Sequence, residues 1–288
     1  MAQVTKHGFT FVFDRVTGEP VWPIEERAVP QSEVPGEQTS RTQPFPTKPA
    51  PFSAQGILEE NLIDFTPELR ARALEVLEEY QIGPLFTPPL VGKPTAMLPG
   101  YGGGANWPGA AFDPETEMLY VPSMNRPSAI SLGTPDPARS NFRYTRSWAE
   151  VPLIDGLPIV KAPYARIVAI DLKTGDIAWK ATNGGDGPRD HPLLKGLDLP
   201  PLGSNARAAV LVTKTLLFAT EGSGRSGSAT GGGTKLRAFD KATGEVLAAI
   251  ELGGQPTGVP MTYKADGRQY VVVAVATTPA QLVALALP

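Results

Sequence analysis

One short pattern occurs four times along this chain, and it limits the possible folds more than any other feature. Two clear copies are residues 13–22 (FDRVTGEPVW) and 170–179 (IDLKTGDIAW); a third begins at Phe239 and a degenerate one at Phe112. In the clear copies an apolar run ends in Asp, Thr-Gly closes a tight turn, and a second apolar run follows. The Asp side chain can bond the turn backbone and Gly can adopt a positive φ, so each copy predicts a β-hairpin.

Repeated hairpins of this kind predict an all-β fold of the β-propeller type. The four Asp residues are separated by 99, 58 and 69 residues, whereas simple propeller blades repeat every ~40–50 residues. We therefore expect irregular insertions, at 23–65, 123–164 and 182–204, in one partial propeller domain spanning 1–288. The pattern accounts for roughly three to four blades, whereas a closed propeller typically has about four to eight. Since the first copy begins close to Met1, we expect the tail of a longer propeller.

Composition excludes several classes of function. The net charge is -3, and Lys and Arg form no basic stripe, so we expect no nucleic-acid partner. The chain has no run of about 20 apolar residues, so we expect no transmembrane helix. We also expect no signal peptide before the first predicted strand. The chain lacks Cys, which excludes disulfides and a thiol nucleophile. His7 and His191 have no metal-ligand spacing, so the sequence predicts no metal site.

One helix is predicted near 66–80. Thr66 can cap it, Pro67 suits its first position, and Glu68 places an acid in the first turn. The apolar residues of one face then follow at helical spacing, and they are Leu69, Ala73, Leu77 and Tyr80.

A glycine-rich segment at 100–110 (GYGGGANWPGA) is the strongest candidate for a binding site. Its glycines allow close approach of backbone to a ligand. Asn106 offers a donor and an acceptor to a flat polar cofactor, and Trp107 offers a wide apolar face. A tight turn between blades with a packed Trp explains the same residues equally well.

Several segments together resemble the quinoproteins, the dehydrogenases that depend on pyrroloquinoline quinone (PQQ) and fold as eight-bladed propellers. The segments are 6–15 (KHGFTFVFDR), 102–107 (GGGANW) and 254–263 (GQPTGVPMTY). Residues 62–70 and the loop 190–192 are similar to the glucose-dehydrogenase-like branch. The resemblance covers the C-terminal half of that family, with about half the blades.

The resemblance implies a function. It is oxidation of a sugar or alcohol by hydride transfer to PQQ, assisted by Ca²⁺, with electrons passed to a quinone or cytochrome of a respiratory chain and a periplasmic location. It implies that Lys6 reaches the quinone oxygens, that Asn106 touches the cofactor and that Trp107 is its neighbour. The family's catalytic Asp and its calcium ligands lie in the N-terminal half. We therefore expect no catalytic residue and no metal ligand in this chain, and no activity unless a partner supplies that half.

Two departures from the family pattern keep other functions open. The last copy reads Leu247-Ala248-Ala249, without the closing Trp, and Thr277-Thr278 stand where a glycine-rich segment is expected. A non-catalytic propeller scaffold is one alternative, because such scaffolds use the same turn without a cofactor. An inactive, truncated remnant is the other.

Overall fold

The computed structural model describes residues 1–185, 187–204, 206–222 and 232–286, and β-strands make up most of its regular structure. The chain divides into two compact units. Unit 1 comprises Met1–Thr47, Ser53–Gly104 and Asn125–Lys161, and unit 2 comprises Lys48–Phe52, Ala105–Met124 and Ala162–Pro288.

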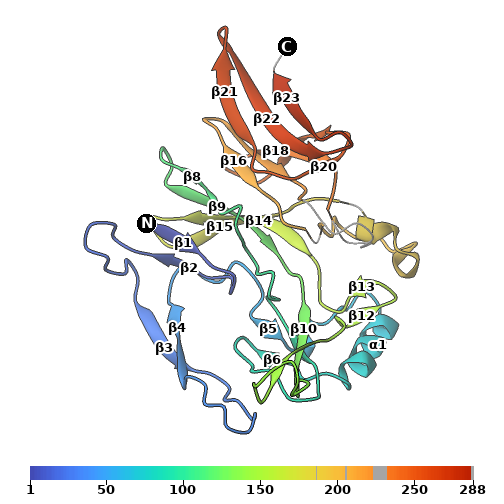
Figure 1. Ribbon diagram of the computed structural model, residues 1–288. Coiled ribbons are helices and arrows are strands. Elements are labelled where there is room, and N and C mark those ends of the chain that lie inside the picture. Colours follow the sequence, from blue (N-terminus) through green and yellow to red (C-terminus); the bar gives the residue numbers. More distant parts are fainter. Residues whose placement is uncertain (186, 205, 223–231, 287–288) are drawn as a thin grey trace. The chain divides into compact units, whose positions relative to one another are not determined.

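The described residues of unit 2 form three antiparallel sheets of four strands each (Figure 1). The first sheet consists of β8 (Ala111–Asp113), β9 (Met118–Met124), β14 (Ala165–Asp171) and β15 (Asp176–Thr182). The second consists of β16 (Val210–Val212), β17 (Leu216–Thr220), β18 (Lys235–Asp240) and β19 (Val246–Glu251). The third consists of β20 (Gln255–Pro256), β21 (Met261–Ala265), β22 (Arg268–Ala276) and β23 (Gln281–Ala286). Four-stranded antiparallel sheets are the blades of a propeller, so the predicted fold class is confirmed.

The repeated turn has the geometry that its sequence predicts. In the third copy, Oδ1 of Asp240 accepts hydrogen bonds from the backbone N–H groups of Ala242 (2.8 Å) and Thr243 (3.0 Å). These two bonds lower the pKa of Asp240. Gly244 then donates its N–H to the carbonyl of Asp240 at 2.9 Å with φ of 78°. The local sequence alone therefore specifies the hairpin.

The degenerate copy keeps the hairpin by a different use of its side chains. Oδ1 of Asp113 accepts from the N–H of Glu115 at 3.0 Å, and the Thr116 hydroxyl donates to Oδ2 at 2.8 Å. Glu117 occupies the glycine position with φ of 58°. Asp113 itself is buried, with 3% of its surface exposed, and Lys241 Nζ lies 2.6 Å from its Oδ2.

Two clusters of buried side chains hold the three sheets of unit 2 together. The first joins the first and second sheets, and its members are Tyr120, Ile167, Ala169, Val210, Leu217, Ala219 and Phe239. The second joins the second and third sheets, and its members are Leu236, Leu252, Val271, Val273 and Val275. Burial of these side chains supplies the main stabilisation of the blades.

Trp179 adds a specific contact between the first two sheets. Its Nε1 donates to the carbonyl of Lys241 at 3.2 Å, and the Tyr120 hydroxyl donates to the same oxygen at 3.0 Å. The indole lies against Gly244 so closely that a Cβ there would stand 2.6 Å from Trp179 Cε3. The glycine of one repeat is therefore required by the Trp of another.

We expect Gly244→Ala to destabilise the protein by about 1–3 kcal/mol more than Gly18→Ala. Both glycines have φ of 78°, but a Cβ at Gly18 meets nothing within 4 Å. The backbone strain is therefore common to both variants, and the difference measures overpacking against Trp179. Urea unfolding of the two variants checks this, and equal losses would contradict the role of the Trp contact.

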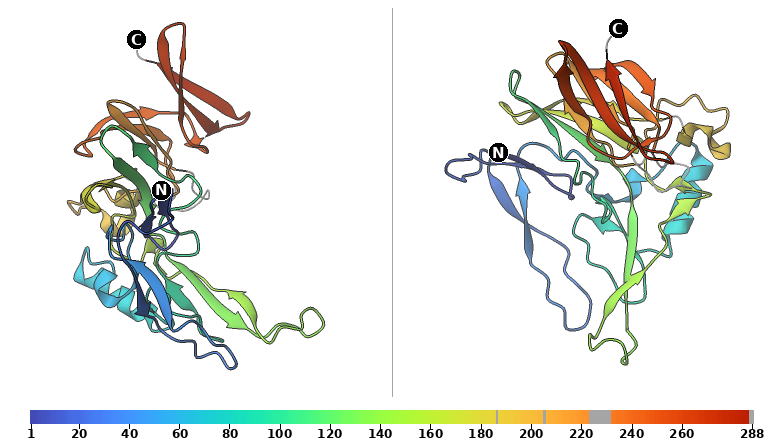
Figure 2. Two further views of the ribbon diagram at one scale, coloured as in Figure 1. Left: turned by 90° about the vertical axis from the view of Figure 1, so that its left-hand side faces the viewer. Right: turned by 45° about the horizontal axis from the view of Figure 1, so that its top comes forward.

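Unit 1 is built from short hairpins and one three-stranded sheet. The hairpins are β1 (Ala2–Val4) with β2 (Thr10–Val12), β3 (Ile24–Ala28) with β4 (Thr42–Pro46), β5 (Gly56–Ile57) with β6 (Gly83–Pro84), and β12 (Leu153–Ile154) with β13 (Leu157–Pro158). The sheet has the order β11-β10-β7, with bounds Thr145–Trp148, Ser128–Gly133 and Thr95–Met97. Strands β10 and β11 form a long yellow-green arm in Figure 2.

The expected insertions carry more regular structure than the sequence analysis predicts. Residues 23–65 include the hairpin β3–β4, and 123–164 include β10 to β13. Within the described part of 182–204 there are two 3₁₀ turns, Gly187–Asp190 and Pro192–Leu194. Prolines hide the strand pattern of β4, because they lack an N–H and are tolerated only at sheet edges and in hairpins such as this one.

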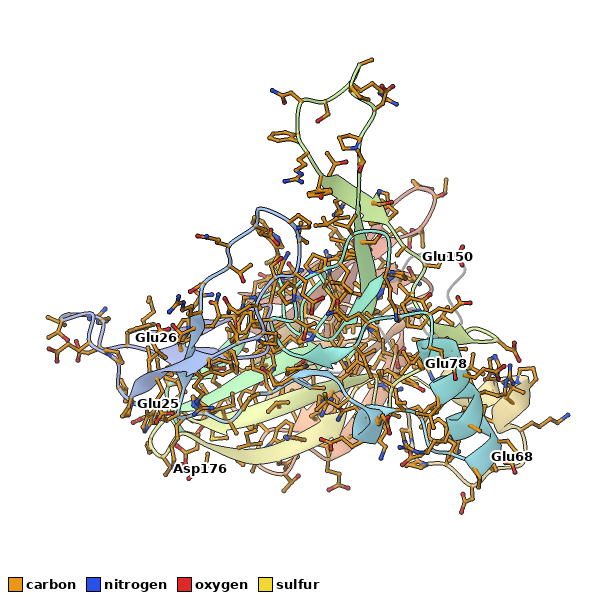
Figure 3. All side chains as sticks on the ribbon, turned by 90° about the horizontal axis from the view of Figure 1, so that it is seen from below. Glu25, Glu26, Glu68, Glu78, Glu150 and Asp176 are labelled. Atoms are coloured by element: carbon orange, nitrogen blue, oxygen red, sulfur yellow. The ribbon has the colours of Figure 1, made fainter. Side chains whose placement is uncertain are left out.

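The predicted helix is confirmed as α1 (Pro67–Leu77). The Thr66 side chain accepts from the N–H of Leu69 at 3.2 Å, which is the predicted cap. Leu69, Ala73 and Leu77 are buried, while Glu68 and Glu78 mark the two ends of the helix in Figure 3. A short 3₁₀ turn, Glu59–Asn61, precedes it.

Candidate functional site

Lys6 lies in the turn between β1 and β2. The Thr5 N–H donates to the carbonyl of Phe9 at 2.9 Å and closes the turn. The exposed Lys6 side chain donates from Nζ to the carbonyl of Tyr101 at 3.3 Å, and the Lys6 carbonyl accepts from the N–H of Gly104 at 2.9 Å. The backbone and the ammonium of Lys6 are thus both tied to the glycine-rich segment.

The first glycines of that segment have packing roles. Gly100 donates its N–H to the carbonyl of Arg126 at 3.1 Å, and a Cβ at Gly100 would overlap the hydroxyl of Ser128. Gly103 has φ of 83° and donates to the carbonyl of Gly100 at 2.7 Å. At these two glycines other residues of the chain approach the backbone closely, as the tight-turn interpretation predicts.

Trp107 does not fit the tight-turn interpretation, because 93% of its surface is exposed. The preceding Asn106 is half-buried, and its Oδ1 accepts from the N–H of Trp107 at 2.8 Å. The N–H of Gly109 donates to the carbonyl of Asn106 at 2.9 Å. The turn therefore holds Asn106 in place and presents the indole to solvent.

The three predicted site residues are divided between the two units. Lys6 belongs to unit 1, and Asn106 and Trp107 belong to unit 2. In the sequence, Asn106 follows Gly104, the partner of the Lys6 carbonyl, by two residues. Asn106 and Trp107 thus lie next to each other in unit 2, whereas Lys6 lies in unit 1.

Within unit 1, Lys6 lines a pocket of about 390 Å³. His7 lies beside it, and the β3–β4 hairpin and its loop contribute Glu37, Thr39, Ser40 and Gln43. Residues 83–89 and 96–101 form the remaining wall. This volume is in the range of pockets for small molecules, so the pocket is a candidate binding site of unit 1.

Phe86 in the pocket wall has an unusual backbone conformation. Its φ is 69°, a left-handed value that a bulky L-residue rarely adopts. Its ring lies 5.0 Å from that of His7 and 5.8 Å from that of Phe45, centroid to centroid. Strain of this kind costs about 1–3 kcal/mol and gathers at binding sites, which favours a functional role for the pocket.

His7 contributes a neutral imidazole to the pocket. Desolvation lowers the pKa of His7 below its ordinary value, and the amide of Gln55 donates to the His7 carbonyl at 2.6 Å. At neutral pH the Lys6 ammonium is therefore the positive charge of the pocket lining, and the Glu37 carboxylate is the negative one.

Sequence reasoning missed Gln43, Glu37 and Phe86. They come from segments that are far from Lys6 in the sequence, and no local pattern connects them. One weak signal was present, because 83–89 (GPLFTPP) concentrates prolines around a single aromatic residue. Such a segment has few conformations and can hold a strained residue.

Comparison with known proteins identifies the family. The model of the "Glucose/ethanol/alcohol dehydrogenase, beta-propeller domain" of PQQ proteins matches residues 1–271. The chain belongs to this family. The resemblance stated from the sequence is thereby confirmed, as is the β-propeller fold.

Two curated relatives and one solved structure are similar to this chain. The glycerol dehydrogenase large subunit of Gluconobacter thailandicus is 32% identical, with 93% of this chain and 39% of the relative covered. The quinate/shikimate dehydrogenase (quinone) of Acinetobacter baylyi is 29% identical, with 93% and 35% covered. A quinohemoprotein alcohol dehydrogenase from Pseudomonas putida shares the fold, with a TM-score of 0.50, 18% identity, and 96% and 32% covered.

This PQQ-family chain therefore spans well under half the length of the curated relatives it matches. The match lies in their C-terminal half. Among the described residues, no helix is long and apolar enough to cross a membrane.

The three residues predicted to contact the cofactor are of the chemical types that PQQ requires. PQQ carries carboxylates and two quinone oxygens on a flat ring, so it requires a cation, hydrogen-bond donors and apolar contact. The Lys6 ammonium at the pocket, the Asn106 amide and the exposed Trp107 face supply these groups. Calcium is different, because in the described ranges no three His, Asp or Glu side chains gather as a metal site.

Proposed function

We propose that this chain is the C-terminal part of a PQQ-dependent dehydrogenase. The complete enzyme oxidises a sugar or another alcohol by hydride transfer to the quinone and passes the electrons to a respiratory quinone or cytochrome. We place it in the periplasm, as the family resemblance implies. The observation that carries the proposal is the family match over residues 1–271, together with the location of Lys6 at a pocket.

Lys6 holds the quinone oxygens in this proposal. When bound, PQQ supplies the electron acceptor for the substrate's hydride. The Lys6 ammonium donates a hydrogen bond to an oxygen on which negative charge develops, and such a preorganised donor acts on the transition state more than on the ground state. Its anchor on the carbonyl of Tyr101 is long, at 3.3 Å, so the other N–H donors stay available for the ligand.

Asn106 and Trp107 orient the cofactor. The Asn106 Oδ1 is engaged by the N–H of Trp107, which fixes the amide plane. The exposed Trp107 indole offers the cofactor an apolar surface next to Asn106 in the sequence. We propose that the calcium ligands and the catalytic base come from the half of the family's propeller that this chain does not match.

We expect no alcohol or sugar dehydrogenase activity from this chain alone with PQQ, Ca²⁺ and a dye acceptor. Joined to the N-terminal part of the glycerol dehydrogenase large subunit, it should give dye reduction with glycerol or glucose. The matched control is the N-terminal part without this chain. Turnover by the chain alone would mean that it carries a base of its own. An inactive chimera that folds and binds PQQ would instead favour the scaffold or remnant function.

A further inference from the structure

The β3–β4 hairpin pairs with no other strand in the described part of unit 1 (Figure 1). Four of the five residues of β3 are exposed. The loop 29–41 between the two strands nevertheless lines the pocket beside Lys6, through Val29, Pro30, Glu37, Thr39 and Ser40. Because an isolated two-stranded hairpin is only marginally stable, this side of the pocket is held in place by contacts other than strand pairing.

The loop 29–41 makes most of its hydrogen bonds within itself. The Ser32 hydroxyl donates to the carboxylate of Glu37, and the Ser32 N–H donates to the hydroxyl oxygen of Thr39 at 3.2 Å. The N–H of Glu37 donates to the carbonyl of Val34 at 3.0 Å. These bonds move together with the loop, so the loop is a compact segment that can swing as one body.

Two contacts hold this loop to the rest of unit 1. Nη1 of Arg143, in the turn of the β10–β11 arm, donates to the carbonyl of Pro35 at 3.2 Å. Among the described residues this is the one hydrogen bond between 29–41 and any residue outside the hairpin. The neighbouring Gly36 lets the guanidinium come close, since a Cβ there would stand 3.3 Å from Nη1 of Arg143. The second contact is Val34, the buried side chain of the loop, which is 6% exposed.

The other side of the pocket is stiff. Its segment 83–89 contains three prolines, each of which fixes its own φ. The segment 96–101 begins in β7, where Ala96 pairs with Ala129 of the three-stranded sheet. The pocket therefore lies between a wall that strand pairing and prolines hold in place and a hairpin that only two contacts hold at its loop.

We infer that the β3–β4 hairpin is a flap over the Lys6 pocket, that Arg143 and Val34 hold it closed, and that its opening admits and releases the ligand of the pocket. Opening breaks one hydrogen bond and exposes one apolar side chain, so it occurs while the rest of unit 1 stays folded. A flap of this kind sets the rates of ligand entry and release. The flap follows from contacts within unit 1, and the identity of the ligand as PQQ rests on the proposed function.

Thiol labelling of the full chain tests the flap without any ligand, because the chain has no Cys of its own. Val34→Cys places one thiol under the flap, where a chromogenic disulfide reagent reaches it only during opening. Val160→Cys is the matched control, since Val160 is 1% exposed and lies in unit 1 outside the hairpin. The thiol at 34 should react at least about 100-fold faster than the thiol at 160, because local opening requires less free energy than global unfolding. Equal rates would overturn the inference.

Removal of the Arg143 side chain tests the contact that holds the flap closed. In the Val34→Cys chain, Arg143→Ala should speed labelling about fivefold, the effect of losing one exposed hydrogen bond. Labelling of Val160→Cys should not change. Arg139→Ala is the matched control, because Arg139 is an exposed Arg of the same arm whose side chain has no described bond to the loop 29–41. An unchanged labelling rate in Arg143→Ala would overturn the role of Arg143.

Release of PQQ from the chimera tests the role of the flap in ligand exchange. Arg143→Ala should release PQQ about fivefold faster than the wild type, and Arg139→Ala should release it at the wild-type rate. Bound PQQ whose release is the same in all three proteins would overturn this role. A chimera that binds no PQQ would contradict the proposed function instead, and the labelling rates of the chain alone would still decide whether the flap opens.

Discussion

In the completed enzyme, Lys6→Ala should lower kcat/KM by roughly 10²–10³-fold, the effect of removing one donor that stabilises a developing oxyanion. Most of the loss should be in kcat, because the interaction strengthens as charge develops on the quinone oxygen. Thermal stability should change little, since the Lys6 side chain is exposed and makes one long bond, 3.3 Å, to the carbonyl of Tyr101.

Steady-state kinetics and a melting curve on the PQQ-loaded chimera check this result. Lys264→Ala is the matched control, because it removes an exposed Lys from β21 outside the proposed site. Lys6→Arg keeps the charge and should recover part of the activity. A kinetically silent Lys6→Ala would show that the cofactor's oxygens are held by other residues.

Lys241→Met should lower the free energy of unfolding by about 3–5 kcal/mol, the cost of leaving one partner of a buried ion pair alone. Lys241 Nζ and Asp113 Oδ2 are 2.6 Å apart, and the two side chains are 15% and 5% exposed. Without the ammonium, the Asp113 carboxylate keeps its turn bonds but remains a buried charge. Urea unfolding at neutral pH measures the loss.

Lys173→Met is the matched control for that measurement. Lys173 pairs with Glu117 at 3.9 Å, and both side chains are about half exposed. An exposed pair of this kind contributes at most about 1 kcal/mol. If both variants lost the same stability, the Asp113–Lys241 pair would not be acting as a buried pair.

The pH dependence of the Lys241→Met effect follows from Asp113. Burial acts to raise the pKa of Asp113, but the bonds from Lys241, Thr116 and Glu115 together lower it below its ordinary value. The pair's contribution is therefore complete above the pKa of an unfolded Asp, about 3.9, and is lost as the pH falls through the lower folded value. The difference between wild type and Lys241→Met should shrink below about pH 4.

The parts of the fold that depend on local chemistry could be predicted from the sequence. Asp240 and Gly244 specify their turn through bonds to residues that are within four positions, so the hairpins and their strands were predictable. Thr66 and Pro67 likewise specify the start of α1. The role of Asp113 was not predictable, because its decisive partner, Lys241, is 128 residues away.

The candidate site was predictable only where a family resemblance supplied the residues. Lys6 has no local pattern of its own, and the pocket around it is assembled from Gln43, Phe86 and other residues of separate segments. The exposure of Trp107 was also undetermined, because a Trp after glycines suits a buried and an exposed position equally. Long-range packing decides both, and a single sequence does not encode it in any short pattern.

The position that Trp179 occupies in its copy of the repeat is occupied by Ala248 in the last copy. Trp179 pairs with Ala169 in the first sheet, and Ala248 pairs with Ala238 at the same place in the second. The Trp179 indole therefore bridges the first and second sheets, whereas the contact between the second and third sheets consists of Leu and Val side chains with Phe218 packed against them and has no indole. The third sheet should therefore open more easily than the first. In native-state hydrogen exchange, the amides of β22 should show a lower free energy of opening than the amides of β14.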